Sequence, residues 1–318
     1  MNDFEFKKKF GQNFLTDKNL LTQIVEKSGV MSDEVVVEIG AGRGALTEVL
    51  SGYAKKVYSF EIDKELFDFL TDKNLLMQIV EKSGVMSDEV VVEIGAGRGA
   101  LTEVLSGYAK KVYSFEIDKE LFDFLTEKFD GTNVEMIFKD VMQVSDEELN
   151  QIIGSKFRLV ANLPYYITSP ILTRFLQNPN LLSATVMVQE EVADRIVAGP
   201  KTKDYGVLTI ICQMFGKSSK VLRVNRKMFY PVPNVDSAVV HIEKTINADE
   251  SYTKFIAFVK RAFTMRRKKL SSNLESPKIS KQDLEDLFVK NGFSATCRAE
   301  ELSVADFKHL FEQIGDKI

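Results

Sequence analysis

The stretch Val35-Val36-Val37-Glu38-Ile39-Gly40-Ala41-Gly42-Arg43-Gly44 decides the fold of this chain, and residues 90–99 repeat it without a change. A short apolar run of β-branched residues predicts a buried strand. Three glycines at alternate positions predict a tight turn, and the apolar pattern that begins at Ala45 predicts a helix. Strand, turn and helix in this order are the first half of a βαβ unit.

This stretch belongs to a tandem duplication in which residues 16–70 recur as residues 71–125. The two copies differ at one of 55 positions, where Thr22 stands against Met77. A period of 55 residues lies outside the usual solenoid and propeller periods, and such arrays need about three or more copies to bury a continuous core. Since removal of one copy leaves 263 residues, we interpret the chain as a two-domain protein with an extra piece of its first domain.

Alternating strands and helices continue beyond the duplication. Each copy predicts helix, strand, turn, helix, strand and helix, and further strands are expected at residues 134–138, 157–161, 184–188, 221–224 and 237–242. This order predicts an α/β fold with a doubly wound, mainly parallel sheet. From Ser251 onward the pattern is helical only, so we expect a sheet domain at residues 1–247 and a small all-helical C-terminal domain at residues 248–318.

Composition excludes several classes of protein. The 318 residues are 44% hydrophobic and 28% charged, which is ordinary for a globular protein and excludes disorder, collagen and coiled coil. No apolar run approaches the roughly 20 residues of a membrane span, and residues 1–10 lack the apolar core of a signal peptide. We therefore expect a cytoplasmic protein. Two cysteines and two histidines, without metal-ligand spacing, predict no metal site.

The glycine turn is typical of a cofactor site, but it does not show which cofactor binds. Such a turn lets backbone N–H groups approach a ligand at a helix N-terminus. The spacing Gly40-x-Gly42-x-x-Ala45 also fits the dinucleotide pattern. An acidic residue at the end of the next strand, Glu61 or Glu116, would bind ribose hydroxyls in either case. These residues alone leave NAD, S-adenosylmethionine and a purely structural turn open.

The tetrapeptide Asn162-Leu163-Pro164-Tyr165 favours methyl transfer. It follows a predicted strand, and open parallel sheets bind ligands outside the carboxyl ends of their strands. The exocyclic amine of a nucleobase is a poor nucleophile, so its methylation is helped by acceptors that hold it toward a sulfonium carbon. The Asn162 side chain and the Leu163 carbonyl could be those acceptors, with Pro164 fixing the turn and Tyr165 stacking on the base.

Five motifs, in order, resemble one family. They are Lys9-Phe10-Gly11-Gln12-Asn13-Phe14-Leu15, the glycine stretch from Val37 to Gly44, Asn162-Leu163-Pro164-Tyr165-Tyr166-Ile167-Thr168-Ser169-Pro170, residues 229–239 (Phe-Tyr-Pro-Val-Pro-Asn-Val-Asp-Ser-Ala-Val) and Arg266-Arg267-Lys268-Lys269-Leu270. Together they resemble the KsgA-type small-subunit (16S) ribosomal RNA adenine dimethyltransferases across the whole chain, apart from one surplus copy of the repeat.

The resemblance implies a Rossmann-like class I methyltransferase fold and a site. Asn13 and Leu15 would close over the methionine part of S-adenosylmethionine. Gly40 or Gly95 would lie against the cofactor, Glu61 or Glu116 would bind its ribose, and Asp140 would bind its adenine amine. Asn162 would face both the cofactor and the target base. The implied reaction places two methyl groups on each of two adjacent adenines in a small-subunit rRNA hairpin.

The resemblance also gives a role to the basic segment Arg266, Arg267, Lys268 and Lys269. From Ser251 onward the chain carries 13 basic and 9 acidic residues, a net charge of +4, which leaves −8 for the first 250 residues. Such a run is usually a solvated helix face. Beside an RNA-modifying site, phosphate contact is the better interpretation, because backbone neutralisation supplies most non-specific affinity for nucleic acid. The expected partner is small-subunit rRNA or the pre-30S particle, bound by a monomer.

Three alternatives stay open. An Erm-like enzyme would modify large-subunit rRNA with the same first-domain motifs. A non-catalytic ribosome-assembly factor would result if the duplication breaks the site. An NAD enzyme is a distant third, since neither Asn162-Leu163-Pro164-Tyr165 nor the basic segment serves hydride transfer.

The duplication leaves open which copy builds the site. The second copy leads directly into the strand at Val134, which favours it for the central sheet. The first copy would then be a surplus, less stable module, with one long helix over residues 66–80 joining the two.

Overall fold

The computed structural model describes residues 17–39, 41, 44–60, 64–163, 167–228 and 234–318. The chain divides into two compact units, residues 1–75 and residues 76–318. The boundary falls inside one helix, close to the junction of the two copies. The first unit therefore holds the first copy, and the second unit holds nearly all of the second copy together with the rest of the chain.

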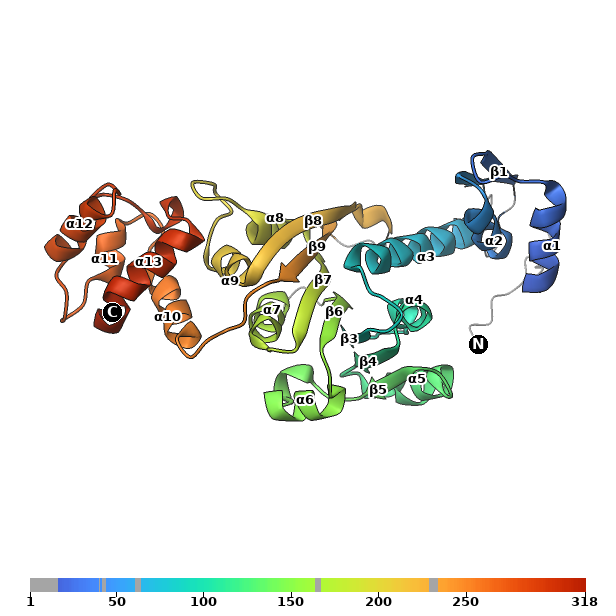
Figure 1. The fold of residues 1–318 in the computed structure, drawn as a ribbon, viewed down its shortest axis with the longest axis horizontal. Helices are drawn as coiled ribbons and strands as arrows, with labels where there is room; N and C mark the ends of the chain where they lie inside the picture. Colours follow the sequence, from blue (N-terminus) through green and yellow to red (C-terminus); the bar gives the residue numbers. More distant parts are fainter. Residues whose placement is uncertain (1–16, 40, 42–43, 61–63, 164–166, 229–233) are drawn as a thin grey trace. The chain divides into compact units, whose positions relative to one another are not determined.

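The first unit is small. It contains α1 (Lys18–Ser28), β1 (Val35–Ile39), α2 (Ala45–Tyr53), β2 (Lys56–Phe60) and the beginning of α3 (Lys64–Ser83), all labelled in Figure 1. β1 and β2 form a two-stranded parallel sheet. The long helix α3 confirms the predicted continuous helix between the two copies.

The second unit is built on a seven-stranded sheet. Its strands are β3 (Val90–Ile94), β4 (Lys111–Phe115), β5 (Val134–Ile137), β6 (Phe157–Asn162), β7 (Leu181–Gln189), β8 (Gly216–Val224) and β9 (Ser237–Lys244). Their order is β5-β4-β3-β6-β7-β9-β8, and only β9 runs opposite to the others. The prediction of a doubly wound, mainly parallel sheet is confirmed.

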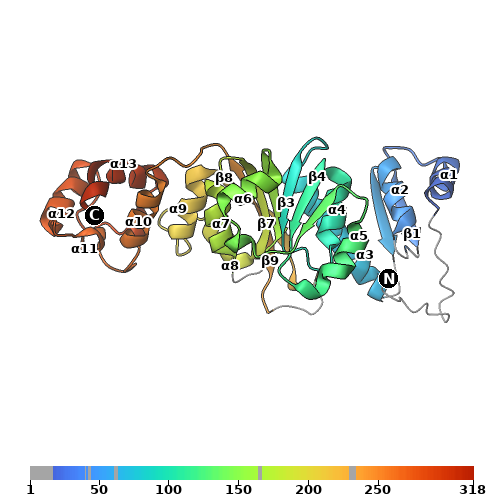
Figure 2. The ribbon, with the colours of Figure 1, turned by 90° about the horizontal axis from the view of Figure 1, so that it is seen from below.

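Helices lie on both sides of this sheet in Figures 1 and 2. The α-helices are α4 (Ala100–Tyr108), α5 (Phe122–Phe129), α6 (Asp146–Ile153), α7 (Thr168–Gln177), α8 (Glu190–Val197) and α9 (Val207–Phe215). Short 3-10 turns are η2 (Lys119–Leu121), η3 (Val141–Gln143) and η4 (Arg226–Met228). The helix predicted at the end of the second copy therefore begins as the 3-10 turn η2, capped by the Asp118 side chain.

After β9 the described chain is helical apart from an isolated bridge between Ser276 and Ile279. Its elements are α10 (Tyr252–Ala262), α11 (Leu270–Leu274), α12 (Lys281–Lys290), η5 (Ala299–Glu301), α13 (Val304–Ile314) and η6 (Gly315–Lys317). The predicted change to a helical pattern is confirmed. The boundary between residues 247 and 248 stays a prediction.

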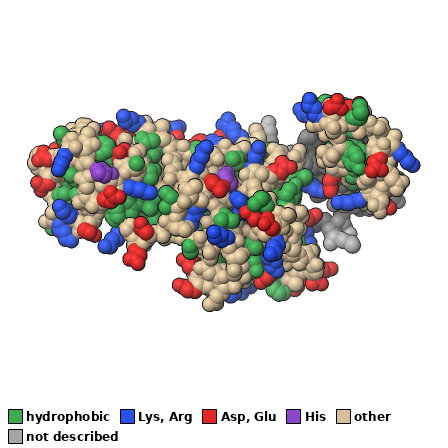
Figure 3. All heavy atoms as spheres, in the orientation of Figure 1, with side chains coloured by type: hydrophobic (Ala, Val, Ile, Leu, Met, Phe, Trp, Pro, Cys, Tyr) green, Lys and Arg blue, Asp and Glu red, His purple; other side chains and the backbone are tan. Residues whose placement is uncertain are grey.

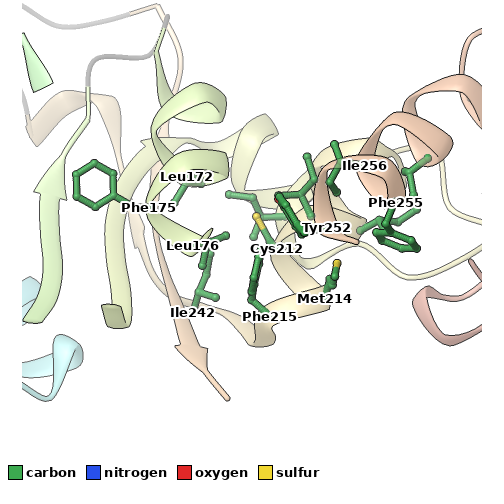
Figure 4. Close-up of a cluster of buried hydrophobic side chains, with 14 of the residues drawn as sticks. Leu172, Phe175, Leu176, Cys212, Met214, Phe215, Ile242, Tyr252, Phe255 and Ile256 are labelled. Atoms are coloured by element: carbon green, nitrogen blue, oxygen red, sulfur yellow. The ribbon is translucent and has the colours of Figure 1, made fainter. Parts of the chain in front are cut away.

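One hydrophobic core runs from the sheet into these helices. Figure 4 shows side chains of α7, α9, β9 and α10 packed together, among them Phe175, Phe215 and Tyr252. The Phe215 and Tyr252 rings lie 5.1 Å apart. Phe255 and Val259 are buried and Phe263 packs against the same core, so this stripe is structural, as its spacing predicts.

The two copies fold alike but differ in burial. β1 and β2 have the same register as β3 and β4. Ile24 and Val37 of the first copy are 41% and 60% exposed, whereas their counterparts Ile79 and Val92 are completely buried. The second copy supplies the central sheet, as its direct connection to Val134 predicts. In the first copy the same apolar side chains face solvent, which supports the expectation of a less stable module.

We expect deletion of residues 16–70 to leave the second unit folded. The remaining 263 residues keep every strand of the seven-stranded sheet and lose a unit that exposes apolar side chains, whose burial is worth roughly 1.5–3 kcal/mol each. Differential scanning calorimetry of the full chain should show two transitions, and the shortened chain only the one at higher temperature. A shortened chain that does not fold would show that the first unit supports the sheet.

Candidate functional site at the carboxyl edge of the sheet

The sheet topology brings four predicted site residues to one edge. β3, β4, β5 and β6 point the same way, so their carboxyl ends meet at one edge of the sheet. From β5 the chain crosses to β6 on the other side of β3, which makes a topological switch point between β3 and β6, the usual place for a ligand. The residues at this edge are Gly95, Glu116, Asp140 and Asn162.

Other predicted site residues lie outside the described part of the chain. These are Asn13, Leu15, Gly40, Glu61, Pro164 and Tyr165.

The glycine turn after β3 is held by the next strand. Glu116, at the end of β4, accepts hydrogen bonds from the backbone N–H groups of Gly97 (2.7 Å), Ile117 (2.8 Å) and Asp118 (2.9 Å). Gly97 has a φ of +53°, and a Cβ atom placed on it would meet no atom within 4 Å. The outer side of the turn is therefore open to a ligand, while Glu116 fixes its inner side.

Helix α5 supports the same turn from another direction. Lys128 donates to the carbonyl oxygens of Arg98 (3.2 Å) and Gly99 (3.3 Å). A Cβ atom on Gly99 would lie 2.6 Å from the Phe129 ring, so this position requires glycine for close packing. Lys128 was not predicted to support the glycine turn. Its signal, a lysine followed by an aromatic residue on a helix, is too common to be informative.

A buried carboxylate, Glu93, lies one residue before the end of β3. Its Oε2 accepts hydrogen bonds from the Thr102 and Ser114 hydroxyls, both at 2.6 Å. Its Oε1 is buried without a partner among the described residues. Burial raises the pKa of Glu93 to about 7, although both hydroxyls favour the ionised form. Glu93 was not predicted as a site residue; its sequence signal is a carboxylate inside an apolar strand.

Asp140 and Asn162 lie at the ends of the two strands that flank β3 and β4. Asp140 accepts from the backbone N–H of Met142 (2.9 Å) and the side chain of Gln143 (3.1 Å), and so begins η3. Asn162 is exposed, and Leu163 is buried with its N–H donated to the Met187 carbonyl (3.2 Å). The backbone at Leu163 is thus fixed to β7, while the Asn162 side chain faces outward.

The basic segment is not uniformly free. Arg266 pairs with Glu300 (2.7 Å) and Lys269 with Glu285 (3.3 Å). Arg267 and Lys268 are exposed, and within the described chain neither has an ion pair. Arg261, in α10 before the basic segment, donates hydrogen bonds to the main-chain oxygens of Asn273, Glu275 and Ile318. It therefore joins α10 to later parts of the chain.

The cysteines, the possible metal ligands and the helix lengths bear on further functional features of the described chain. Cys212 and Cys297 are buried and unbridged, and burial raises their pKa to about 12 and about 11. Across the described ranges, no group of three His, Cys, Asp or Glu side chains has metal-binding geometry. No described helix is both long and apolar enough to cross a membrane.

A doubly wound sheet with one reversed strand, and a glycine turn at its switch point, defines a class I methyltransferase fold. Two solved structures share it. A dimethyladenosine transferase from Plasmodium falciparum superposes with a TM-score of 0.64 at 25% identity, over 77% of this chain and 96% of that one. The 23S rRNA methyltransferase ErmE gives a TM-score of 0.58 at 27% identity, over 76% and 96%.

Sequence comparison narrows the class to one family. The profile of the ribosomal RNA adenine dimethylase family matches residues 3–70 and again residues 67–316, so the two matches meet where the two copies meet. Ribosomal RNA small subunit methyltransferase A of Caldanaerobacter subterraneus is 42% identical over 249 residues, 76% of this chain and 93% of the relative. The enzyme of that name from Clostridium acetobutylicum is 39% identical over 267 residues, 81% and 95%.

The chain therefore belongs to the ribosomal RNA adenine dimethylase family. The predictions of a class I methyltransferase fold, of S-adenosylmethionine as cofactor and of rRNA adenine dimethylation as activity are confirmed at the level of the family.

We expect Glu93→Gln to remove a pH dependence of stability. Because the folded-state pKa of about 7 is above the ordinary value of 4.5, Glu93 favours the folded state at low pH, and this contribution is lost as the pH rises from 4.5 through 7. The difference corresponds to on the order of 2 to 3 kcal/mol. Urea unfolding of the full chain between pH 5 and pH 8 would measure it.

Glu38→Gln is the matched control, since Glu38 accepts from Thr47 and Ser59 in the same way within the first unit. A variant at Glu93 whose stability still fell with rising pH as in the original chain would contradict the assignment.

Proposed function

We propose that the edge formed by β3, β4, β5 and β6 transfers methyl groups from S-adenosylmethionine to two adjacent adenines in a hairpin of small-subunit rRNA, two to each. The observation that carries this proposal is the position of Asn162. It is exposed at the end of β6, and β6 pairs with β3, the strand that leads into the glycine turn. The sequence relatives named for the small subunit support the choice of RNA.

The residues at this edge fit S-adenosylmethionine. The open side of Gly97 would let the cofactor approach the backbone. Oε1 of Glu93, which has no hydrogen-bond partner among the described residues, could accept a hydrogen bond from the cofactor. Glu116 would bind the cofactor ribose. Three of its roughly four acceptor positions are filled by backbone N–H groups, which leaves about one for a ribose hydroxyl. Asp140 would bind the adenine amine. Bound there, the cofactor supplies a methyl group activated by its sulfonium.

Two apolar side chains beside these carboxylates support an adenine site. Ile117 directly follows Glu116, and Met142 lies two residues after Asp140; they are 64% and 38% exposed. Exposed apolar side chains at the edge of a sheet are a feature of ligand sites, where a flat ring covers them. We propose that Ile117 and Met142 contact the faces of the cofactor adenine. Neither residue was predicted from the sequence as a site residue, because the residue type alone does not show whether an apolar side chain is exposed to solvent.

Asn162 and Leu163 would hold the target base. The Asn162 side-chain oxygen and the Leu163 carbonyl accept hydrogen bonds from the adenine amine and direct its lone pair at the methyl group. The bound cofactor would supply the methyl group, its sulfur keeping the electron pair of the carbon–sulfur bond, and the proton of the alkylated amine would leave to water. Positioning of this kind lowers the barrier without a strong base. Pro164 and Tyr165 would fix the turn and stack on the base.

The finer assignments form part of the same proposal. Asn13 and Leu15 would cover the methionine part of the cofactor, and Gly95 and Glu116 rather than Gly40 and Glu61 would complete the site. Residues 1–247 would act as the methyltransferase domain and residues 248–318 as the RNA-binding domain. The chain would act as a monomer on the pre-30S particle in the cytoplasm.

The fold does not separate this proposal from an Erm-like enzyme, since ErmE has the same architecture. Mass spectrometry of small-subunit and large-subunit rRNA, each incubated with the protein and S-adenosylmethionine, distinguishes the two. Dimethyladenosine in the small-subunit rRNA supports the proposal. Methylation of the large-subunit rRNA alone favours the Erm-like function, and no methylation of either favours an assembly factor.

We expect Asn162→Ala to abolish methyl transfer while cofactor affinity stays within about tenfold. The contacts to the reacting amine matter mainly in the transition state, so kcat should fall more than binding does. Single-turnover methylation and isothermal titration with S-adenosylmethionine measure the two effects. Unchanged turnover would rule out the role of Asn162.

A pair of double variants tests which copy binds the cofactor. Gly95→Asp with Gly97→Asp should abolish S-adenosylmethionine binding, because the new side chains obstruct the turn and Gly97 has a positive φ. The matched pair Gly40→Asp with Gly42→Asp should leave binding unchanged. Loss of binding only with the second pair would show that the first copy forms the site.

A further inference from the structure

The loop of residues 199–205, between α8 and α9, is fixed to the C-terminal helices. The backbone N–H of Lys201 donates to the Glu300 carbonyl at 2.7 Å. The Tyr205 hydroxyl donates to the Leu302 carbonyl at 2.7 Å, and its buried ring lies 6.3 Å from the ring of Phe263. Residues about 100 positions apart are therefore joined around η5.

Arg266 joins this loop to the basic segment. Its guanidinium donates to the Glu300 carboxylate at 2.7 Å and to the Thr202 carbonyl at 3.0 Å. Arg266 thus bridges residues of the loop and of η5, and its charge is partly neutralised by Glu300. The neighbours of Arg266, Arg267 and Lys268, are exposed and have no ion pair within the described chain.

The loop presents two further cations beside them. Lys201 and Lys203 are exposed, and Lys201 has a φ of +66°, the single positive φ of a non-glycine residue in the described ranges. Glycine would adopt this conformation without strain, so the lysine is held in a conformation that its own side chain disfavours. Strain of this kind is typical of functional positions. Figure 3 shows basic side chains spread over the helical region, mixed with acidic ones.

We propose that Lys201, Lys203, Arg267 and Lys268 form one surface that binds the phosphate backbone of rRNA, with Arg266 as the positioning residue that holds its two halves together. The proposal rests on the function proposed above, in which rRNA is the substrate. Two cationic segments separated by more than 60 residues are brought together before RNA binds, which reduces the ordering cost of association. Lys269 is excluded, because Glu285 pairs with it.

The test is the salt dependence of binding to a small-subunit rRNA transcript. Each phosphate contact contributes about 0.7 to 0.9 to the slope of log K against log salt. Lys201→Gly with Lys203→Ala should reduce the magnitude of that slope by about 1.4 to 1.8. With equal affinity at 1 M salt, this raises Kd roughly fifteenfold to thirtyfold at 0.15 M salt. Glycine at 201 relieves the backbone strain, so the variant should fold.

Lys156→Ala with Lys290→Ala is the matched control. It removes two exposed lysines, one at the amino end of β6 and one at the end of α12, and should leave the slope unchanged. Arg266→Ala should weaken binding through the loop, so its effect and that of the Lys201 and Lys203 changes should not add. Full additivity would overturn the role of Arg266.

If the Lys201 and Lys203 variant still binds and methylates rRNA, and its slope of log K against log salt is unchanged, the proposal of a phosphate-binding surface is wrong. Failure of the proposed function has a different result, since the original chain itself would then neither methylate the transcript nor bind it in a salt-dependent way.

Discussion

The parallel pairing of β3 with β6 is the interaction on which the site depends. It joins the strand that leads into the glycine turn to the strand that ends at Asn162, through the pairs from Val90–Phe157 to Val92–Leu159. Since both strands point the same way, their carboxyl ends lie side by side, and a ligand on the turn is next to Asn162. β1 has the same sequence as β3 but belongs to a two-stranded sheet with β2. Among the described strands, β1 pairs with β2 alone.

The duplication separates what local sequence determines from what the rest of the fold determines. Strand register is the same in both copies, and Glu38 and Glu93 each accept hydrogen bonds from one threonine and one serine. These features follow from the 55 residues themselves. Burial of Val92 and Ile79 does not, because it requires the strands and helices that pack against the second copy within the second unit. The same peptide is therefore a core element in one place and an exposed module in the other.

Sequence patterns predicted the architecture because each strand and helix has its own periodicity and the chain order of βα units restricts the topology. They also predicted Glu116 and Asn162 at the ends of strands, where residues that follow parallel strands meet. Asp140 was predicted only from the family resemblance. Sequence patterns could not predict the hydrogen bond from Lys128 to the glycine turn or the hydrogen bond from Arg266 to the Thr202 carbonyl. Those contacts join residues about 30 and 64 positions apart on surfaces without a repeating pattern. Nor could they show which basic side chains are already paired.

The order of synthesis gives the surplus copy a further consequence. The first copy leaves the ribosome before the second, and both precede β5 and β6, so two equivalent βαβ segments are present when the remaining strands emerge. The second copy is joined to β5 by a short connection through α5, whereas the first would have to loop out 55 residues. Loop closure costs more for the longer connection, but only logarithmically. Proximity along the nascent chain, rather than a difference in side chains, therefore favours the second copy for the seven-stranded sheet.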